Sequence, residues 1–233
     1  MYIYGKNVAK ERLNSNEKII RAYLSDKFND QSIIRALHQK KVKINYLTNK
    51  ELDHKVDGLH QGIILEVDDI KTYNYQDIIP HIKKEYPLVV MLDHLEDPHN
   101  FGAIIRTSVA LGVDAIIIPN DRNVPINGTV AKTSAGAISH IPIIRVPNLN
   151  STITKLKQDG YWIIGTDMEG SNYRTIDYHM PICLIIGNEG KGMSKVIKDN
   201  CDYIATIPMT GKINSLNASV SCAIILSQIT GTR

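Results

Sequence analysis

The chain has 233 residues, of which 43% are hydrophobic and 22% charged, an ordinary balance for a globular protein with a sizeable core. No apolar run approaches the roughly 20 residues of a transmembrane helix, and the first residues lack the apolar core of a signal peptide, so we expect a cytoplasmic protein without a membrane partner. Cys183, Cys201 and Cys222 form no CxxC pair. This spacing argues against a zinc site or a disulfide framework and favours buried, reduced thiols.

The formal net charge is only +3, and all of the excess lies in the N-terminal part. Residues 1–86 carry 15 Lys and Arg against 12 Asp and Glu, whereas residues 87–233 carry 12 of each. A modest basic excess occurs in proteins that bind polyanions, but a solvated charged surface is its more common cause. The charge alone therefore decides little about the partner.

Residues 1–69 are predicted to form a small α/β domain. Apolar spacing predicts a helix over Gly5–Leu13 and another that begins after Asp30 and ends in a basic cluster. Residues 70–86 break this pattern with charge, tyrosine and proline, and we interpret them as a linker that contains one or two helical turns. Strands are expected at Lys18–Leu24, Ile44–Leu47 and Gly62–Val67.

From Pro87 onward, apolar strand segments alternate regularly with segments of helical spacing. This alternation predicts an α/β domain over residues 87–233 with a mainly parallel sheet. The expected strands are Leu88–Leu92, Ala115–Ile118, Ile141–Val146, Tyr161–Gly165, Ile182–Ile186 and Tyr203–Pro208, and the expected helices are Phe101–Leu111, Asn127–Ala137, Leu149–Gln158 and Leu216–Ile229.

The first candidate site segment, residues 97–107, reads DPHNFGAIIRT. Asn100 lies where we expect a helix N-cap, and Arg106 follows on the same helix less than two turns later. An ordinary cap and a surface arginine would explain this pattern. However, Arg106 is flanked by apolar and small residues, and an arginine in such surroundings needs an anionic partner or a polar cleft.

The second segment, residues 187–194, reads GNEGKGMS and follows an apolar strand. Its glycine spacing does not match GxGxxG, and the order Lys191-Gly192 excludes GxxxxGK[ST], so neither NAD nor ATP is favoured. Glu189 is either a solvated residue of a turn or an active-site carboxylate.

The third segment, residues 215–221, reads SLNASVS and opens the last helix. Ser215 or Asn217 would cap this helix in the simplest interpretation. The loops that contain the second and third segments each follow a strand, and open α/β sheets bind ligands at the carboxyl ends of their strands. We therefore expect one shared pocket, with Arg106 and Glu189 as its ionic members. The histidines show no metal-ligand spacing, so no metal is expected.

Together, these three segments resemble the motifs of the SpoU (TrmH-like) family of RNA ribose 2′-O-methyltransferases, within the SPOUT class. The resemblance covers residues 88–230. The segments Tyr4–Val8 (YGKNV) and His60–Ile63 (HQGI) are similar to the small L30e-like substrate-binding domain that precedes the catalytic domain in 23S rRNA guanosine 2′-O-methyltransferases.

The resemblance implies a C-terminal trefoil knot, which ordinary folds lack, S-adenosylmethionine as cofactor, a homodimer formed by the methyltransferase domain, and a guanosine of 23S rRNA as substrate. A tRNA ribose methyltransferase and a non-catalytic RNA-binding protein remain the alternatives. The implied catalytic residues are Asn100, Arg106, Glu189, Ser215 and Asn217, and the implied cofactor contacts are Thr166, Gly187, Ile207, Met209 and Leu216.

The family resemblance gives Arg106 the central role, sometimes as the base. A guanidinium has a pKa above about 12 and does not deprotonate in proteins. Our hypothesis is that Arg106 holds the phosphate of the target nucleotide and stabilises developing alkoxide charge. Asn100 and Glu189 would orient it or the ribose, while Ser215 and Asn217 complete the wall. Candidate RNA contacts in the basic N-terminal domain are Arg35, Lys40, Lys41 and Lys43.

Overall fold

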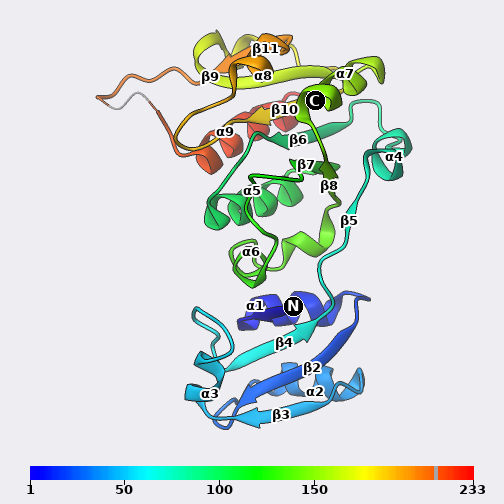
Figure 1. Ribbon diagram of the computed structural model, residues 1–233, viewed down its shortest axis with the longest axis vertical. Coiled ribbons are helices and arrows are strands. Elements are labelled where there is room, and N and C mark those ends of the chain that lie inside the picture. The colour runs from blue at the N-terminus through cyan, green and yellow to red at the C-terminus, as the bar shows by residue number, and fades with distance from the viewer. Residues whose placement is uncertain (213–214) are drawn as a thin grey trace. The chain divides into compact units, whose positions relative to one another are not determined.

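The computed structural model describes residues 1–212 and 215–233, which fold into two compact units (Figure 1). Unit 1 combines Met1–Ile70 with Pro125–Ser139, and unit 2 combines Lys71–Val124 with His140–Arg233. The domain boundaries expected from the sequence, with a linker at residues 70–86, stay a prediction. No helix of the described residues is long and apolar enough to cross a membrane.

Unit 1 contains a mixed sheet whose strands follow the order β1-β4-β2-β3. β2 pairs with β3 in parallel and with β4 in an antiparallel arrangement. The structure confirms the expected strands and the first two helices. The apolar pattern did not predict the three-residue β1 or the short α3, although a capping box at Thr48 marks the start of α3. The elements are β1 (Tyr2–Tyr4), α1 (Lys6–Asn14), β2 (Ile19–Ser25), α2 (Gln31–Gln39), β3 (Ile44–Leu47), α3 (Asn49–Asp53), β4 (Ile63–Val67) and α6 (Gly128–Thr133).

In the described residues, the sheet of unit 2 has seven strands in the order β11-β9-β10-β6-β7-β8-β5, all parallel to their neighbours. This confirms the α/β fold with a mainly parallel sheet; the trefoil knot stays a prediction. The strands are β5 (Thr72–Tyr73), β6 (Leu88–Leu92), β7 (Ala115–Pro119), β8 (Ile143–Val146), β9 (Trp162–Asn172), β10 (Ile182–Ile186) and β11 (Tyr203–Thr206).

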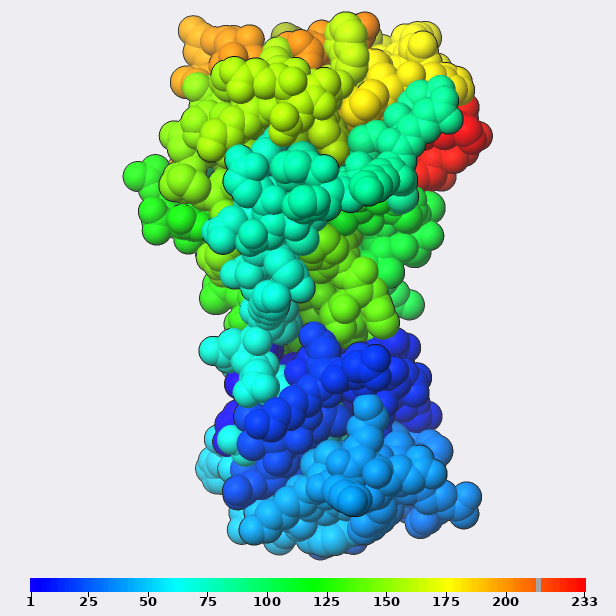
Figure 2. Space-filling model, turned by 90° about the vertical axis from the view of Figure 1, so that its right-hand side faces the viewer, coloured from blue at the N-terminus to red at the C-terminus, as the bar shows by residue number. Residues whose placement is uncertain are grey.

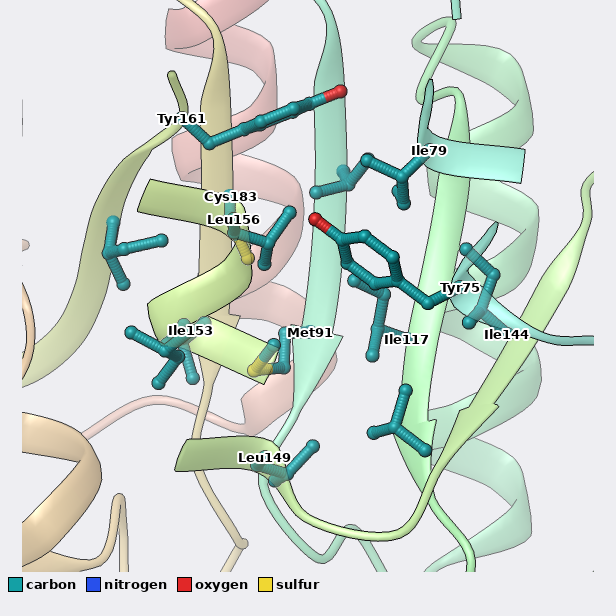
Figure 3. Packing of buried hydrophobic residues seen from close by; sticks show 14 of the residues in the cluster. Tyr75, Ile79, Met91, Ile117, Ile144, Leu149, Ile153, Leu156, Tyr161 and Cys183 are labelled. Atoms are coloured by element: carbon teal, nitrogen blue, oxygen red, sulfur yellow. The ribbon is translucent and has the colours of Figure 1, made fainter. Parts of the chain in front are cut away.

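Helices cover both faces of this sheet, as the continuous apolar runs of its central strands require. On one face, the side chains of α4 and α7 pack over strand residues such as Met91 and Cys183 (Figure 3). On the other face, α5 packs against α9. The helices are α4 (Tyr75–Ile78), α5 (Pro98–Ala110), α7 (Leu149–Gln158), α8 (Lys195–Asp199) and α9 (Ala218–Gly231), with 3-10 turns η1 (Ile79–His81), η2 (Ala137–His140) and η3 (Tyr173–Thr175).

The structure adds detail to the expected linker and shortens one expected helix. Residues 72–81, inside the expected linker, form β5, α4 and η1, and their Tyr75 and Ile79 are buried in the core (Figure 3). Tyr75 also donates a hydrogen bond to Asp159 at 2.7 Å. The helix expected over Asn127–Ala137 ends at Thr133, because the following Ala135 and Gly136 adopt positive φ angles of 52° and 85° that a helix cannot continue.

Candidate active site

Helix α5 begins at Pro98, and its N-cap is Asp97, whose side chain accepts a hydrogen bond from the backbone nitrogen of His99 at 2.9 Å. The prediction that Asn100 occupies the N-cap position was therefore wrong. Proline at the first helical position fits this start, because its missing N–H would be unpaired there anyway. Asn100 instead lies in the first turn, only 7% exposed, and its amide is free to bond elsewhere.

The amide of Asn100 connects two other predicted site residues. Its Nδ2 donates to Glu189 Oε1 at 3.1 Å, and its Oδ1 accepts from Asn217 Nδ2 at 2.9 Å. Glu189 Oε1 also accepts from the backbone nitrogen of Asp97 at 3.3 Å. Three of the five expected catalytic residues, from three separate segments of the chain, thus form one hydrogen-bonded chain, which we call the Asn100 network (Asn100, Glu189 and Asn217).

The loop that carries Glu189 is held in shape by its neighbour Asn188. Asn188 Oδ1 accepts from the backbone nitrogens of Gly190 and Lys191, and its Nδ2 donates to the carbonyl oxygen of His94 at 2.8 Å. A Cβ at Gly187 would lie 2.4 Å from the backbone nitrogen of Met193, so this tight fold admits only glycine there. The carboxylate of Glu189 is therefore exposed but fixed in position.

Helix α9 begins where the third segment predicted. Asn217 is its N-cap, and its Oδ1 accepts from the backbone nitrogens of Ser219 and Val220. The capping interpretation is correct for Asn217, but the same side chain also uses its Nδ2 to bond Asn100. Ser215 is exposed and precedes the cap by two residues.

Arg106 lies on the exposed side of α5, about one and a half helical turns beyond Asn100. Within residues 1–212 and 215–233, no hydrogen bond or ion pair engages its guanidinium. The other expected ionic member of the pocket, Glu189, is held by Asn100 and the backbone of Asp97. The structure therefore brings Glu189 into a network and leaves the planar donor fork of Arg106 available to an anion.

Three of the expected cofactor contacts lie on, or directly after, adjacent parallel strands. Gly165 of β9 lies in register with Ile185 of β10 and with Ile204 of β11. Thr166 follows Gly165 within β9, whereas Gly187 and Ile207 come directly after the last residues of β10 and β11. Thr166 Oγ1 donates to the carbonyl oxygen of Ile185 at 3.1 Å. This is the edge at which parallel sheets bind ligands.

The same edge has an apolar character. Ile207 is half-buried, while Met209 and Leu216 remain 38% and 39% exposed. Exposed apolar side chains beside backbone strand ends suit the adenosine and the methionyl chain of S-adenosylmethionine. The residues present thus fit S-adenosylmethionine.

One site residue was missed by the sequence analysis. Asp93 directly follows β6, is only 2% exposed, and accepts a hydrogen bond at Oδ2 from the backbone nitrogen of Ser194 at 2.8 Å. Its Oδ1 lies 2.5 Å from Nδ1 of His94. Asp93 therefore ties the end of β6 to the end of the glycine-rich loop. A carboxylate placed directly after a fully apolar strand was the signal.

The four expected RNA contacts, Arg35, Lys40, Lys41 and Lys43, are all exposed on unit 1. They lie on α2 or between α2 and β3, in the segment coloured light blue in Figure 2. Lys40 donates from Nζ to the carbonyl oxygen of Ser15 at 2.7 Å, so part of its donor capacity is already used.

Comparison with known families matches both parts of the chain. Residues 87–227 match the SpoU rRNA Methylase family, and residues 2–73 match the model described as RNA 2′-O ribose methyltransferase substrate binding. The chain is 39% identical to the putative TrmH family tRNA/rRNA methyltransferase YacO of Bacillus subtilis, over 98% of this chain and 94% of that protein. The chain therefore belongs to the SpoU rRNA methylase family, and it is an RNA 2′-O-ribose methyltransferase that uses S-adenosylmethionine.

Solved structures show the same relationship. The AdoMet-bound rRNA methyltransferase from Sinorhizobium meliloti superposes with a TM-score of 0.81 and 25% identity, covering 99% of this chain and 87% of that chain. The A. aeolicus TrmH/SpoU tRNA modifying enzyme has 33% identity and a TM-score of 0.59, and it covers 65% of this chain and 77% of its own.

Proposed function

We propose that this enzyme methylates the ribose 2′-hydroxyl of a guanosine in 23S rRNA. The observation that carries the choice of rRNA is the N-terminal match to a substrate-binding domain over residues 2–73. The rRNA methyltransferase of S. meliloti is similar to 99% of this chain, whereas the tRNA modifying enzyme of A. aeolicus covers only 65% of it. An additional substrate-binding domain is more useful for a large, structured RNA, so its presence favours rRNA as the substrate.

Bound S-adenosylmethionine supplies a methyl group that its sulfonium already activates, so the protein must mainly align the 2′-oxygen and help it lose its proton. In the proposed mechanism, Arg106 binds the phosphate next to the target ribose and stabilises charge on the 2′-oxygen as its proton leaves. A free, planar guanidinium suits this role because it offers two parallel N–H donors in a fixed fork.

The Asn100 network would bind the ribose and fix its orientation relative to Arg106. Glu189, fixed by Asn100 at 3.1 Å, is close to the start of α5 and would accept a hydrogen bond from the ribose or orient the arginine. Ser215 and Asn217 would complete the wall at the start of α9. Fixed side chains lower the barrier because they need no reorganisation when charge develops.

Backbone groups near Thr166, Gly187 and Ile207, together with the apolar side chains of Met209 and Leu216, would hold the cofactor. We further propose a homodimer formed by the methyltransferase domain, a trefoil knot around the cofactor cradle, and cytoplasmic residence. The basic residues Arg35, Lys40, Lys41 and Lys43 would contact RNA phosphates, which position an RNA without reading its sequence.

A direct test supplies the purified enzyme with methyl-labelled S-adenosylmethionine and either 23S rRNA or tRNA from a strain that lacks the gene. The proposal expects label at a single ribose of 23S rRNA. Label in tRNA alone would replace the rRNA assignment with the tRNA alternative. Cofactor binding without transfer to either RNA would support a non-catalytic RNA-binding protein.

A further inference from the structure

Unit 1 has a surface hollow of ≈ 210 Å³ at the carboxyl ends of its parallel strands β2 and β3. Its lining includes Lys6, Lys27, Phe28, Asn29, Asn49 and Gln61. We call it the Phe28 hollow. It is separate from the basic residues near the end of α2, because Lys41 and Lys43 precede β3 whereas Asn49 follows it.

The two N-terminal segments that resemble a substrate-binding domain meet at this hollow. Gln61 Oε1 accepts a hydrogen bond from the backbone nitrogen of Lys6 at 2.8 Å, and the backbone nitrogen of Gly5 donates to the carbonyl oxygen of Ile63. Gly5 is the N-cap of α1 and has no side chain that could accept a hydrogen bond, so Gln61 pairs one of the unpaired N–H groups of the first turn instead. Residues 55 positions apart in the chain are thus held together at the wall of the hollow.

Gly62 lines the hollow, and the buried His60 behind it holds its backbone in place. Gly62 has a φ angle of 79°, and a Cβ there would lie 3.2 Å from Phe28 Cδ2, so the glycine lets the phenylalanine ring lie close over the backbone. The backbone nitrogen of Gly62 donates to Nδ1 of His60, whose Nε2 lies 3.0 Å from Asp53 Oδ1. The ring of Phe28 is therefore placed on a rigid base, although it is only half-buried.

The chemistry of the lining is that of a nucleotide site. The Lys6 ammonium lies 5.4 Å from the centroid of the Phe28 ring, and Lys27 is exposed beside it. The described lining residues have two positive charges and no carboxylate, and Asn29, Asn49 and Gln61 add amide donors and acceptors. An aromatic face with amides suits an unstacked base, and lysines suit its phosphates.

We propose that the Phe28 hollow binds one unpaired nucleotide of the substrate RNA, with the base on the Phe28 ring and its phosphates on Lys6 and Lys27. This rests on the proposed function, since it takes RNA as the substrate. The hollow would select RNAs that present an unpaired base in addition to the target ribose. The exposed lysines before β3 would then add general attraction to the backbone without selecting a base.

The test measures affinity of the full-length enzyme for deproteinised 23S rRNA from a strain that lacks the gene. Phe28→Leu keeps apolar volume over Gly62 but removes the aromatic face, and Phe28→Tyr keeps the face. The proposal expects Phe28→Leu to raise Kd by about 5- to 150-fold, the range for loss of one stacked base, and Phe28→Tyr to retain the wild-type Kd. Tyr46→Ala, which removes a 58% exposed ring outside the hollow, should change Kd less than 2-fold.

The lysines are tested through salt dependence. Lys27→Gln should lower the slope of log affinity against log salt by about 0.7, the value for one lost contact to single-stranded RNA. Lys50→Gln, an exposed lysine of α3 outside the lining, is the matched control and should leave the slope unchanged. The affinity for S-adenosylmethionine, measured by calorimetry, should remain unchanged in all variants.

Wild-type affinity in Phe28→Leu, with normal thermal unfolding, would overturn the hollow proposal while the proposed function stands. Equal losses in Lys27→Gln and Lys50→Gln would likewise reduce the site to general charge attraction and overturn it. If the wild-type enzyme labels tRNA and not 23S rRNA, the rRNA assignment fails; the same variants are then measured on tRNA, where loss in Phe28→Leu supports the hollow and wild-type binding overturns it.

Discussion

Polar side chains lie at the ends of parallel strands in two regions, the carboxyl edge of the unit 2 sheet and the Phe28 hollow of unit 1. The two regions differ in how far these side chains bond to other groups of the protein. In unit 2, Asn100, Glu189 and Asn217 bond to one another at 2.9 and 3.1 Å. In unit 1, the hollow has three amide side chains, those of Asn29, Asn49 and Gln61. Within the residues that the structure describes, only Gln61 bonds to another protein group, the backbone nitrogen of Lys6 at 2.8 Å. The polar side chains of unit 2 are already held in place by one another, whereas the hollow of unit 1 has amides without protein partners among the described residues and the ring of Phe28.

We expect this difference to separate catalysis, at the unit 2 site, from RNA binding, at the hollow of unit 1. A fixed network lowers the cost of aligning reacting atoms, so changes in it should act mainly on kcat. Open groups on a surface contribute affinity before and during the reaction, so changes in the hollow should act mainly on RNA binding. The following variants test the unit 2 side of this comparison, in order of decreasing effect.

Arg106→Lys should have the largest effect. It keeps the positive charge but loses the planar donor fork, and we expect kcat to fall about 10²- to 10³-fold, as for loss of a donor to a developing oxyanion. S-adenosylmethionine affinity should not change. Single-turnover methylation of RNA measures the loss, with Arg122→Lys, another exposed arginine, as the control. Normal turnover in Arg106→Lys would rule out a positioned guanidinium.

Glu189→Ala should come next. It removes the acceptor of the Asn100 amide and of the Asp97 backbone, and we expect kcat to fall about 10- to 100-fold through lost positioning. Glu189→Gln keeps an oxygen acceptor and should recover most of the activity at every pH. A loss of activity in Glu189→Gln that matches Glu189→Ala, with the acidic limb of the pH profile removed, would instead identify Glu189 as a proton acceptor.

Gly187→Ala should weaken cofactor binding by about tenfold or more, because its new Cβ would overlap the backbone of Met193 and push the loop out of shape. Gly190→Ala in the same loop is a matched control: the nearest atom to its Cβ would be Asn188 Oδ1, at 3.7 Å. Calorimetry with S-adenosylmethionine measures both. Equal affinities in the two variants would remove the first loop from the cofactor cradle.

Asn217→Asp separates the two roles of this residue. Aspartate still caps α9 but has no Nδ2 to donate to Asn100, so we expect unchanged stability and a loss of several-fold in kcat. Asn217→Ala should additionally lower the free energy of unfolding by about 1 kcal/mol, the usual value of a cap. Urea unfolding and turnover measured together distinguish these outcomes; full activity in Asn217→Asp would show that the amide bond is not needed.

The smallest expected effect is on stability and concerns the ion pair between Asp167 and Lys198, in which Asp167 Oδ2 lies 2.9 Å from Lys198 Nζ. Burial raises the pKa of this carboxyl, but hydrogen bonds from Lys198 and from two backbone nitrogens outweigh burial and leave the pKa lowered. The pair therefore stabilises the fold above the unfolded pKa near 3.9 and loses this effect as pH falls further. Asp167→Asn should cost less than about 1 kcal/mol at pH 7 and progressively less below pH 4, measured by urea unfolding. A constant cost across this range would contradict the ionic origin.

The repeating strand–helix pattern predicted nearly every element of unit 2, because apolar periodicity is a local property of the chain. The start of α5 was also present in the sequence, since Pro98 after Asp97 is a stronger N-terminal signal than Asn100. Placing residues 125–139 with the N-terminal residues required contacts across more than 100 positions, such as that between Tyr4 and Thr129. Periodicity carries no such information.

In the candidate site, too, the residues could be predicted from local sequence motifs but their contacts could not. Family resemblance identified Asn100, Glu189 and Asn217, but not that they bond to one another, because these bonds join segments about 90 and 117 positions apart. A truncation of residues 1–70 would remove most of unit 1 and leave residues 125–139 without their packing partners. Point variants on the surface of unit 1 therefore test RNA docking more cleanly.

The central claim is methylation of one ribose in 23S rRNA, and mapping of 2′-O-methyl groups tests it most directly. RNA from a strain that lacks the gene is compared with RNA from the same strain carrying the wild-type enzyme or Arg106→Lys. We expect that one guanosine of 23S rRNA loses its methyl group without the gene, regains it with the wild-type enzyme, and does not regain it with Arg106→Lys. Loss of methylation confined to tRNA, or no change in any RNA, would contradict it.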